Sequence, residues 1–363
     1  MATKTSLTQS NISGWGFALP AFALMVTFII LPFFFALWFS LTNQRLISPN
    51  PAKFIGLTNY TELLSVGTIL LEPERDAQGD IVRTDDGDIK YPRLRNFTRK
   101  NPDYPAIQGM QEWFSWQTGP NNEFKRVILA KDVVFMRALK NTFVFVLVVA
   151  PLQAGLALGL ALLINQKLRG INIYRAIYFM PVVVSIVVVA FLWRLIYDGN
   201  NGLLNNLLGA MSFGWFEPVD WLGQTSTAMG SIIAMSIWQA VGFHMVIWLS
   251  GLQTISPTLY EAADLEGASK WQTFRYVTWP GLRNTAVLVL IVITMQAFGL
   301  FAQVDVMTNG GPLDSTQTIV FQAIERGYGK QDISGGSAIS VLLFLIVLSI
   351  SLLQRYLTRE RHS

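Results

Sequence analysis

The chain has 363 residues, of which 52% are hydrophobic and only 14% are charged, and its formal net charge is +4. This balance is typical of a protein that crosses a membrane several times and argues against a soluble enzyme. Without cysteine, and with only His244 and His362 as histidines, the sequence offers no disulfide, thiol nucleophile or zinc cluster. We therefore predict no metal site and no cofactor on this chain. The basic residues fall in short segments beside apolar runs, where they set membrane topology, so we expect no nucleic acid partner.

Six apolar stretches are each long enough to span a hydrocarbon core about 30 Å thick, which takes a helix of about 20 residues. They cover residues 16–41, 138–165, 174–197, 228–250, 284–306 and 337–356. The first exceeds the apolar part of a secretory signal peptide and has no small-residue cleavage pattern after it, so we interpret it as a permanent span. These stretches predict an all-α polytopic membrane protein with six transmembrane helices.

Lysine and arginine residues concentrate after the second, fourth and sixth spans, which predicts that these connections face the cytoplasm. The residues are Lys167, Arg169, Arg175, Lys270, Arg275, Arg283, Arg355, Arg359 and Arg361. The connection 198–227 has no lysine or arginine. Both termini are then expected in the cytoplasm, as a tail over 1–15 and a tail over 357–363.

The segment 42–137 then lies outside, and its charges and prolines predict a small folded extracytoplasmic insertion rather than embedded chain. Within it, Asp86-Gly87 between short runs of strand formers predicts a β-hairpin over 81–91. The acidic residues there lack the spacing and the downstream glutamate of a calcium loop, so we interpret them as a solvated turn.

The loop 251–283, between the fourth and fifth spans, reads as a pair of short helices. Ser256 and Pro257 are suited to start the first helix and Gly267 to end it, and the capping box Ser269 to Gln272 starts the second. Small side chains at Ala262, Ala263 and Ala268 allow another protein surface to approach, and Glu261, Asp264 and Glu266 offer carboxylates to a basic partner. The alternative is an amphipathic loop lying on the membrane.

The same loop carries a family resemblance. The residues Glu261-Ala262-Ala263, Gly267-Ala268, Phe274 and Pro280 resemble, in order and spacing, the cytoplasmic EAA loop of ABC-importer permeases. From about residue 140 to the end the chain resembles the first permease of maltose and glycerol-phosphate type carbohydrate importers, through Tyr174-Arg175, Phe179-Met180-Pro181 and Thr308-Asn309-Gly310-Gly311-Pro312. The family pattern usually has Asp-Gly where Glu266-Gly267 stands and Leu-Pro where Trp279-Pro280 stands.

The resemblance implies the ABC importer type I permease fold and a transport cycle of alternating access. It implies a second homologous permease, two copies of an ABC ATPase that carry ATP and Mg, an extracytoplasmic solute-binding protein and a carbohydrate solute. It also implies the cytoplasmic membrane of a bacterium or archaeon, with lipid around the spans. The residues implied in ATPase coupling are Glu261, Ala262, Ala263, Asp264, Gly267, Ala268, Phe274 and Pro280.

Two further sets of residues follow from the comparison with this family. Ser236, Gln239 and Phe243 recur at helical spacing in the fourth span, and with Gln296 in the fifth they suit a sugar, because aromatic faces stack on pyranoses and amides bond hydroxyls. Amides that only bridge neighbouring helices explain this pattern equally well. Asn309, Gly310, Gly311 and Pro312 form a tight outer turn, whose structural role is favoured and for which the resemblance adds contact with the binding protein.

The chain has no phosphate-binding loop, since the nearest Gly-Lys pair, Gly329-Lys330, lacks the earlier glycine and the following hydroxyl. We therefore predict a transport subunit that is not an enzyme. One alternative is a self-sufficient secondary transporter driven by an ion gradient, which predicts buried carboxylates or broken spans near the bilayer midplane. Its only acidic candidate is Asp305, near the end of a span. Another is a membrane-anchored receptor that acts through 42–137.

Overall fold

The computed structural model describes residues 17–99, 101–166 and 170–358. The predicted tail 1–15, most of the tail 357–363 with Arg359 and Arg361, and the basic residues Lys167 and Arg169 lie outside the described residues. The chain divides into two compact units. One comprises Met1–Glu62 and Ala323–Leu342, and the other Leu63–Gln322 and Leu343–Ser363.

Helices dominate the described chain, as predicted. Four of them are long and apolar enough to cross a membrane: Phe17–Ser40, Val133–Ile164 (α5), Ala228–Thr254 (α9) and Ile333–Tyr356 within α16 (Ile333–Thr358). Two bent pairs of helices, Ile171–Val183 with Ile186–Ile196 and Lys270–Gly281 with Arg283–Phe298, bring the described spans to six if each pair counts once. The predicted helical membrane fold is confirmed.

The third and fifth spans are broken rather than continuous, which the hydropathy of 174–197 and 284–306 did not indicate. Helices α6 (Ile171–Val183) and α7 (Ile186–Ile196) meet at 95° across Val184, whose backbone is extended, and Ser185. Pro181 lies just before this break, where its missing N–H removes a helical hydrogen bond. The fifth span is interrupted by Gly299, so α13 (Arg283–Phe298) ends before α14 (Ala302–Met307) begins.

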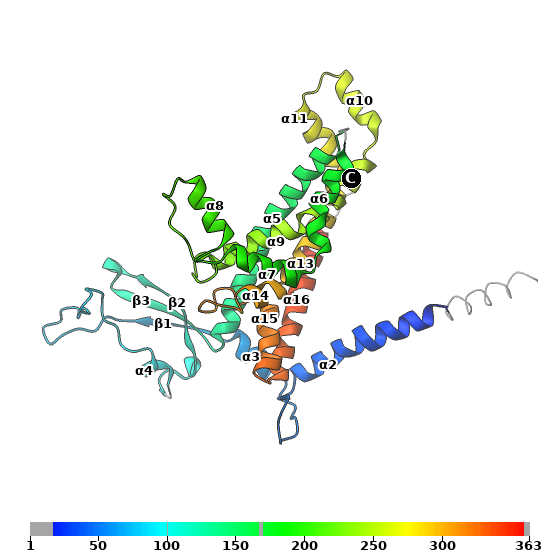
Figure 1. Ribbon diagram of the computed structural model, residues 1–363. Helices are drawn as coiled ribbons and strands as arrows, with labels where there is room; N and C mark the ends of the chain where they lie inside the picture. Colours follow the sequence, from blue (N-terminus) through cyan, green and yellow to red (C-terminus); the bar gives the residue numbers. More distant parts are fainter. Residues whose placement is uncertain (1–16, 100, 167–169, 359–363) are drawn as a thin grey trace, which may run out of the picture. The chain divides into compact units, whose positions relative to one another are not determined.

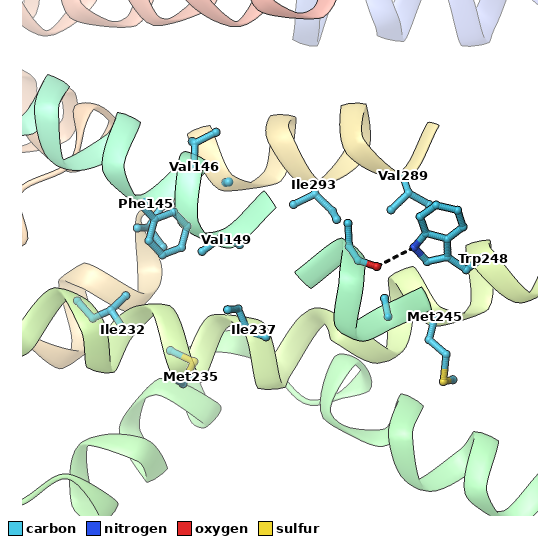
Figure 2. Packing of buried hydrophobic residues seen from close by; sticks show 14 of the residues in the cluster. Phe145, Val146, Val149, Ile232, Met235, Ile237, Met245, Trp248, Val289 and Ile293 are labelled. Carbon is cyan, nitrogen blue, oxygen red and sulfur yellow. Dashed lines mark hydrogen bonds between the residues drawn. The ribbon is translucent and has the colours of Figure 1, made fainter. Parts of the chain in front are cut away.

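Helices α5, α9 and α13 pack together to form the core of the larger unit. Figure 2 shows buried side chains of this core, among them Phe145 and Val149 of α5, Met235 of α9 and Ile293 of α13. Lipid is as apolar as these side chains, so packing and interhelical hydrogen bonds hold such helices together in a bilayer. In one such bond, Trp248 Nε1 of α9 donates to the carbonyl of Ala154 on α5 at 3.1 Å, and Figure 2 marks it with a dashed line.

The small residues that allow close approach on α5 are alanines rather than glycines. Ala154, Ala157 and Ala161 are all buried, whereas Gly155 and Gly159 face outward. A Cβ added at either glycine would meet nothing within 4 Å in the described chain. The Gly-x-x-x-Gly spacing of Gly155 and Gly159, a pattern that often lets two membrane helices pack closely, therefore contacts no other helix among the described residues.

The predicted insertion is folded around a three-stranded antiparallel sheet. Strands β1 (Val66–Leu71), β2 (Gln111–Thr118) and β3 (Phe124–Ala130) lie in the order β1-β3-β2 (Figure 1). One face covers a small core of Ile69, Leu71, Ile107, Met110, Val127 and Leu129. The sequence did not predict these strands.

The predicted turn at Asp86-Gly87 does form, but its flanks remain irregular. Thr84 N donates to Asp88 O at 2.8 Å, and Arg83 pairs with Ile89 in an isolated bridge rather than a ladder. The short helices α3 (Thr58–Leu64) and α4 (Arg95–Thr98) and the 3₁₀ turns Pro105–Ile107 and Pro120–Asn122 complete the segment.

The connection between α7 and α9 is shaped by one buried amide, Asn205, on the short helix α8 (Leu203–Met211). Its Nδ2 donates to the carbonyls of Asp198, Gly199 and Val219, and its Oδ1 accepts from Val219 N and Trp221 Nε1. A single side chain thus satisfies the polar groups that hold the two ends of this loop together.

In the smaller unit, polar bonds anchor the C-terminal end of the first span, which contains a π-helical turn (Val26–Ile30) followed by α2 (Leu31–Ser40). Asn59 Nδ2 donates to the carbonyls of Ser40 and Thr42, each at 2.8 Å. Thr42 Oγ1 lies 3.1 Å from Ser334 Oγ at the start of α16. The helix α15 (Ile319–Ile324) and the π turn Glu325–Gly329 precede α16.

Candidate functional site

The loop between the fourth and fifth spans is a helical hairpin, as predicted (Figure 1). Its first helix, α10, covers Pro257–Leu265. Ser256 occupies the cap position with an extended backbone, but its Oγ bonds Thr258 Oγ1 at 2.8 Å instead of a backbone N–H. Gly267 ends the helix with φ at +71°, a conformation that glycine adopts without strain.

The second arm begins with the predicted capping box. Gln272 N donates to Ser269 Oγ at 3.3 Å, and Ser269 N donates to Gln272 Oε1 at 2.7 Å. Helix α11 (Lys270–Thr273), a π turn (Phe274–Thr278) and α12 (Trp279–Gly281) follow without a gap. Tyr260 Oη lies 3.2 Å from Thr278 Oγ1, which ties the two arms together.

The hairpin exposes large apolar side chains beside carboxylates. Leu265, at the tip, is 90% exposed, and Trp271 and Tyr276 are 66% and 71% exposed. The predicted coupling residues Glu261, Ala262, Asp264, Gly267 and Pro280 are exposed, and Ala263, Ala268 and Phe274 are half-buried. Phe274 stacks on Trp271 with ring centroids 5.7 Å apart. This mixture of apolar and acidic groups is suited to binding another protein.

A cavity of about 340 Å³ lies among α5, α6, α7, α9, α13 and α14, and it brings together all four predicted pathway residues. Ser236, Gln239 and Phe243 line it from one face of α9, and Gln296 lines it from α13. The remaining lining residues are Phe145, Val149, Gln153, Val182, Ile186, Ala240, Ile293, Ala297, Leu300 and Gln303. The cavity lies at both helix breaks, since Val182 and Ile186 flank the first and Leu300 and Gln303 flank the second.

Sequence reasoning missed Gln153, which is only 3% exposed and contributes a third amide to the cavity wall. Its Nε2 lies 2.8 Å from Nδ1 of His244, and the same ring nitrogen lies 3.0 Å from Ala240 O. A lone amide within the apolar run of α5 was the available signal. His244 itself is fully buried and does not line the cavity.

The outer turn predicted at 308–312 packs tightly on the chain that follows it. Thr308 Oγ1 lies 2.7 Å from Thr316 Oγ1, which in turn donates to Gly311 O at 2.8 Å. Gly310, with φ at +81°, is buried, and a Cβ there would lie 2.7 Å from Gln317 Nε2. Asn309 is exposed, while Gly311 and Pro312 are half-buried.

The secondary transporter's predicted broken spans are present among the described residues, but the cavity wall contains no carboxylate. Asp305 is exposed on α14 and does not line the cavity. In the described ranges no three histidine, cysteine or acidic side chains are grouped so that they could hold a metal ion.

Comparison with known proteins identifies relatives for most of the chain. The family model described as binding-protein-dependent transport system inner membrane component matches residues 153–362. A trehalose/maltose transport system permease protein of Thermococcus litoralis is 34% identical over 238 residues, which cover 66% of this chain and 79% of that protein. A diacetylchitobiose uptake system permease protein of Streptomyces coelicolor is 30% identical over 66% of this chain and 71% of that protein.

A third relative is named after a charged solute. An sn-glycerol-3-phosphate transport system permease protein of Yersinia pestis is 28% identical over 71% of this chain and 88% of that protein. Among solved structures, a bacterial ABC transporter involved in the import of the acidic polysaccharide alginate matches with a TM-score of 0.58 at 23% identity, over 63% of this chain and 80% of that chain. This likeness shows a shared fold.

Proposed function

This chain belongs to the family of inner membrane components of binding-protein-dependent transport systems, and we propose that it is the permease subunit of an ABC importer for a carbohydrate. The observation that carries the proposal is the cavity at the two broken spans, lined by amides and phenyl rings. Such a wall suits a solute that presents both hydroxyl groups and apolar ring faces. Two of the relatives bear the names of sugar systems, which supports the same class of solute.

Transport by alternating access needs spans that change direction around the solute. The 95° bend between α6 and α7 and the interruption of the fifth span at Gly299 both lie at the cavity, which α5 and α9 also line. Broken helices are tolerated in a membrane where they line a cavity, and their segments can tilt separately. We infer that rocking of these segments exposes the cavity to each side in turn.

Coupling to ATP hydrolysis is assigned to the hairpin 257–281. Its exposed Leu265 and Trp271 provide an apolar contact, and Glu261, Asp264 and Glu266 provide carboxylates for basic groups on an ATPase. The bond between Tyr260 and Thr278 makes the two arms move as one piece, so a push on α10 passes to α12 and then to α13.

The remaining partners follow from family membership. We propose a second homologous permease, two ATPase subunits that bind ATP and Mg, and an extracytoplasmic binding protein that delivers the solute and contacts the outer turn at Asn309. The membrane is the cytoplasmic membrane of a bacterium or archaeon, with both termini on the cytoplasmic side. This chain itself carries out no hydrolysis.

Affinity purification of the tagged chain from a mild detergent, followed by mass spectrometry, tests the assembly. A second permease and an ATPase with a phosphate-binding loop should be retained. Recovery of the chain alone across several detergents would contradict the importer and favour the secondary transporter.

Uptake into vesicles that contain the assembly then tests the cavity. Gln239→Ala and Gln296→Ala should each lower sugar uptake by at least about fivefold, because each removes from the cavity wall an amide that would hydrogen-bond the solute. Gln253→Ala is the matched control, since this amide is exposed on the same helix as Gln239 but does not line the cavity. Equal uptake by all three variants would remove the cavity from the mechanism.

A further inference from the structure

The charge of the solute is left open by the family, because the similar proteins bear the names of neutral sugars as well as of sn-glycerol 3-phosphate. The cavity wall is more specific. Throughout the part of the chain that the structure describes, every side chain that lines the cavity is uncharged at every physiological pH. We propose that the cavity accepts neutral polyhydroxylated solutes and excludes anionic ones such as sugar phosphates and uronic acids. This inference rests on the proposed function and deepens it.

The polar groups of the wall match hydroxyls better than they match anions. Gln239, Gln296, Gln153 and Gln303 are amides, each with a donor end and an acceptor end, and Ser236 adds a hydroxyl. Sugar hydroxyls also donate and accept, so they can satisfy both ends of an amide. A phosphate or carboxylate only accepts, and it would therefore leave the amide oxygens without donors.

Electrostatics strengthens this preference. An anion that leaves water for a cavity within the membrane loses its hydration and needs a cation to replace it. Burying a neutral hydroxyl is far less costly once it is hydrogen-bonded. Since the wall contributes no lysine, arginine or histidine, this subunit offers an anion no compensating charge.

Charged groups nearby do not supply the missing cation. Arg194 on α7 is directed to the backbone, where its Nη1 donates to the carbonyl of Val306 at 3.4 Å. Asp305, on the neighbouring α14, is exposed and would repel an anion. Neither side chain lines the cavity.

The buried Gln153 also keeps the wall neutral, because its amide stands between His244 and the cavity. The 2.8 Å contact of its Nε2 with His244 Nδ1 holds the amide beside the imidazole ring. His244 is fully buried behind it and is not part of the lining. We therefore assign Gln153 as a solute-contacting residue and His244 as the residue that positions it.

The experiment measures binding to the assembly in lipid nanodiscs without the binding protein, so that only the selectivity of the cavity is read. Thermal unfolding is followed while sugars are added in pairs that differ by one charge: trehalose and trehalose 6-phosphate, maltose and maltose 1-phosphate, glucose and glucuronate. The neutral member of at least one pair should raise the unfolding temperature. The concentration of the neutral sugar that gives half of the maximal shift in unfolding temperature should be at least about tenfold lower than that of its anionic partner. The reason is that no cation in the cavity wall compensates the charge of the anion.

A cation placed in the wall should reverse the preference. Gln296→Arg is expected to lower the half-maximal concentration for the anionic member by about tenfold or more, through a charge-assisted hydrogen bond. The matched control, Gln253→Arg, puts the same charge on an exposed position outside the cavity and should change neither value.

The outcomes separate this inference from the proposed function. Equal half-maximal concentrations for neutral and anionic members in the unaltered assembly would overturn the inference while leaving a sugar importer intact. Stabilisation by no sugar, in an assembly whose vesicles still take up sugar, would also overturn it, because the solute would then bind elsewhere. Absence of both uptake and the partner subunits would instead refute the proposed function.

Discussion

A single backbone angle at Gly267 controls how the docking hairpin turns, and its replacement offers a quantitative test of the coupling role. Gly267 has φ at +71°, and a Cβ added there meets no heavy atom within 4 Å. A substitution therefore acts through backbone conformation alone and not through a collision. Most L residues lose about 1–2 kcal/mol in this left-handed conformation, whereas asparagine adopts it more readily.

These values set the expected changes in binding. Gly267→Ala should weaken the affinity of the ATPase for the permease by about fivefold to thirtyfold, which corresponds to a loss of about 1–2 kcal/mol. Gly267→Asn should stay within roughly threefold of the unaltered protein, because asparagine is enriched in the left-handed region. Gly267→Val should be weaker than Gly267→Ala, since a β-branched residue is a stronger outlier there.

The assay is equilibrium binding of the purified ATPase to the two-permease complex in nanodiscs, together with thermal unfolding of that complex. Because α10 has no buried residue, a substitution that weakens ATPase binding should leave the unfolding temperature of the two-permease complex unchanged. If Ala and Asn at this position bind the ATPase equally well, the left-handed turn does not control docking and the reasoning is refuted.

Three further changes test the coupling surface and the packing. Leu265→Ser should weaken ATPase binding by roughly tenfold to a hundredfold, because burial of a leucine contributes about 1.5–3 kcal/mol, while the unfolding temperature stays constant since this side chain is 90% exposed; unchanged affinity would place the contact elsewhere. Gly242→Ala should destabilise the helix core by about 1–3 kcal/mol in thermal unfolding, because its Cβ would collide with the carbonyl of Tyr178. Gly230→Ala, on the same helix with open space around it, is the control and should be neutral or slightly stabilising; equal effects of the two would argue against the contact. Asn205→Ala should cost about 1–3 kcal/mol and speed hydrogen exchange across 198–221, because it leaves backbone carbonyls without donors; unchanged exchange would show that the amide is dispensable.

Several features were predictable because they depend on short segments of chain. Apolar length alone indicated the spans, and the helical hairpin followed from residues that act on their neighbours: Pro257 at a helix start, Gly267 at its end, and the capping box of Ser269. The strands of the insertion escaped notice because the exposed face of the sheet keeps apolar residues such as Phe114, which hides the usual alternation.

The cavity shows the limit of this reasoning. Helical spacing identified the side of α9 that carries Ser236, Gln239 and Phe243, but not whether another helix would cover it. The partnership of Gln153 with His244 joins residues that are 91 positions apart, so no local pattern could reveal it.

The sequence by itself determined the membrane-spanning character, the approximate positions of the spans and the form of the helical hairpin 257–281, because hydropathy and helix capping act over a few residues. The tertiary structure alone decided that the third span bends, that the fifth is interrupted at Gly299, and that the open space lies at these two breaks. It also decided which amides face that space. These properties arise from packing between helices distant in sequence, and such packing is set by the fit of whole surfaces and not by the composition of any one segment.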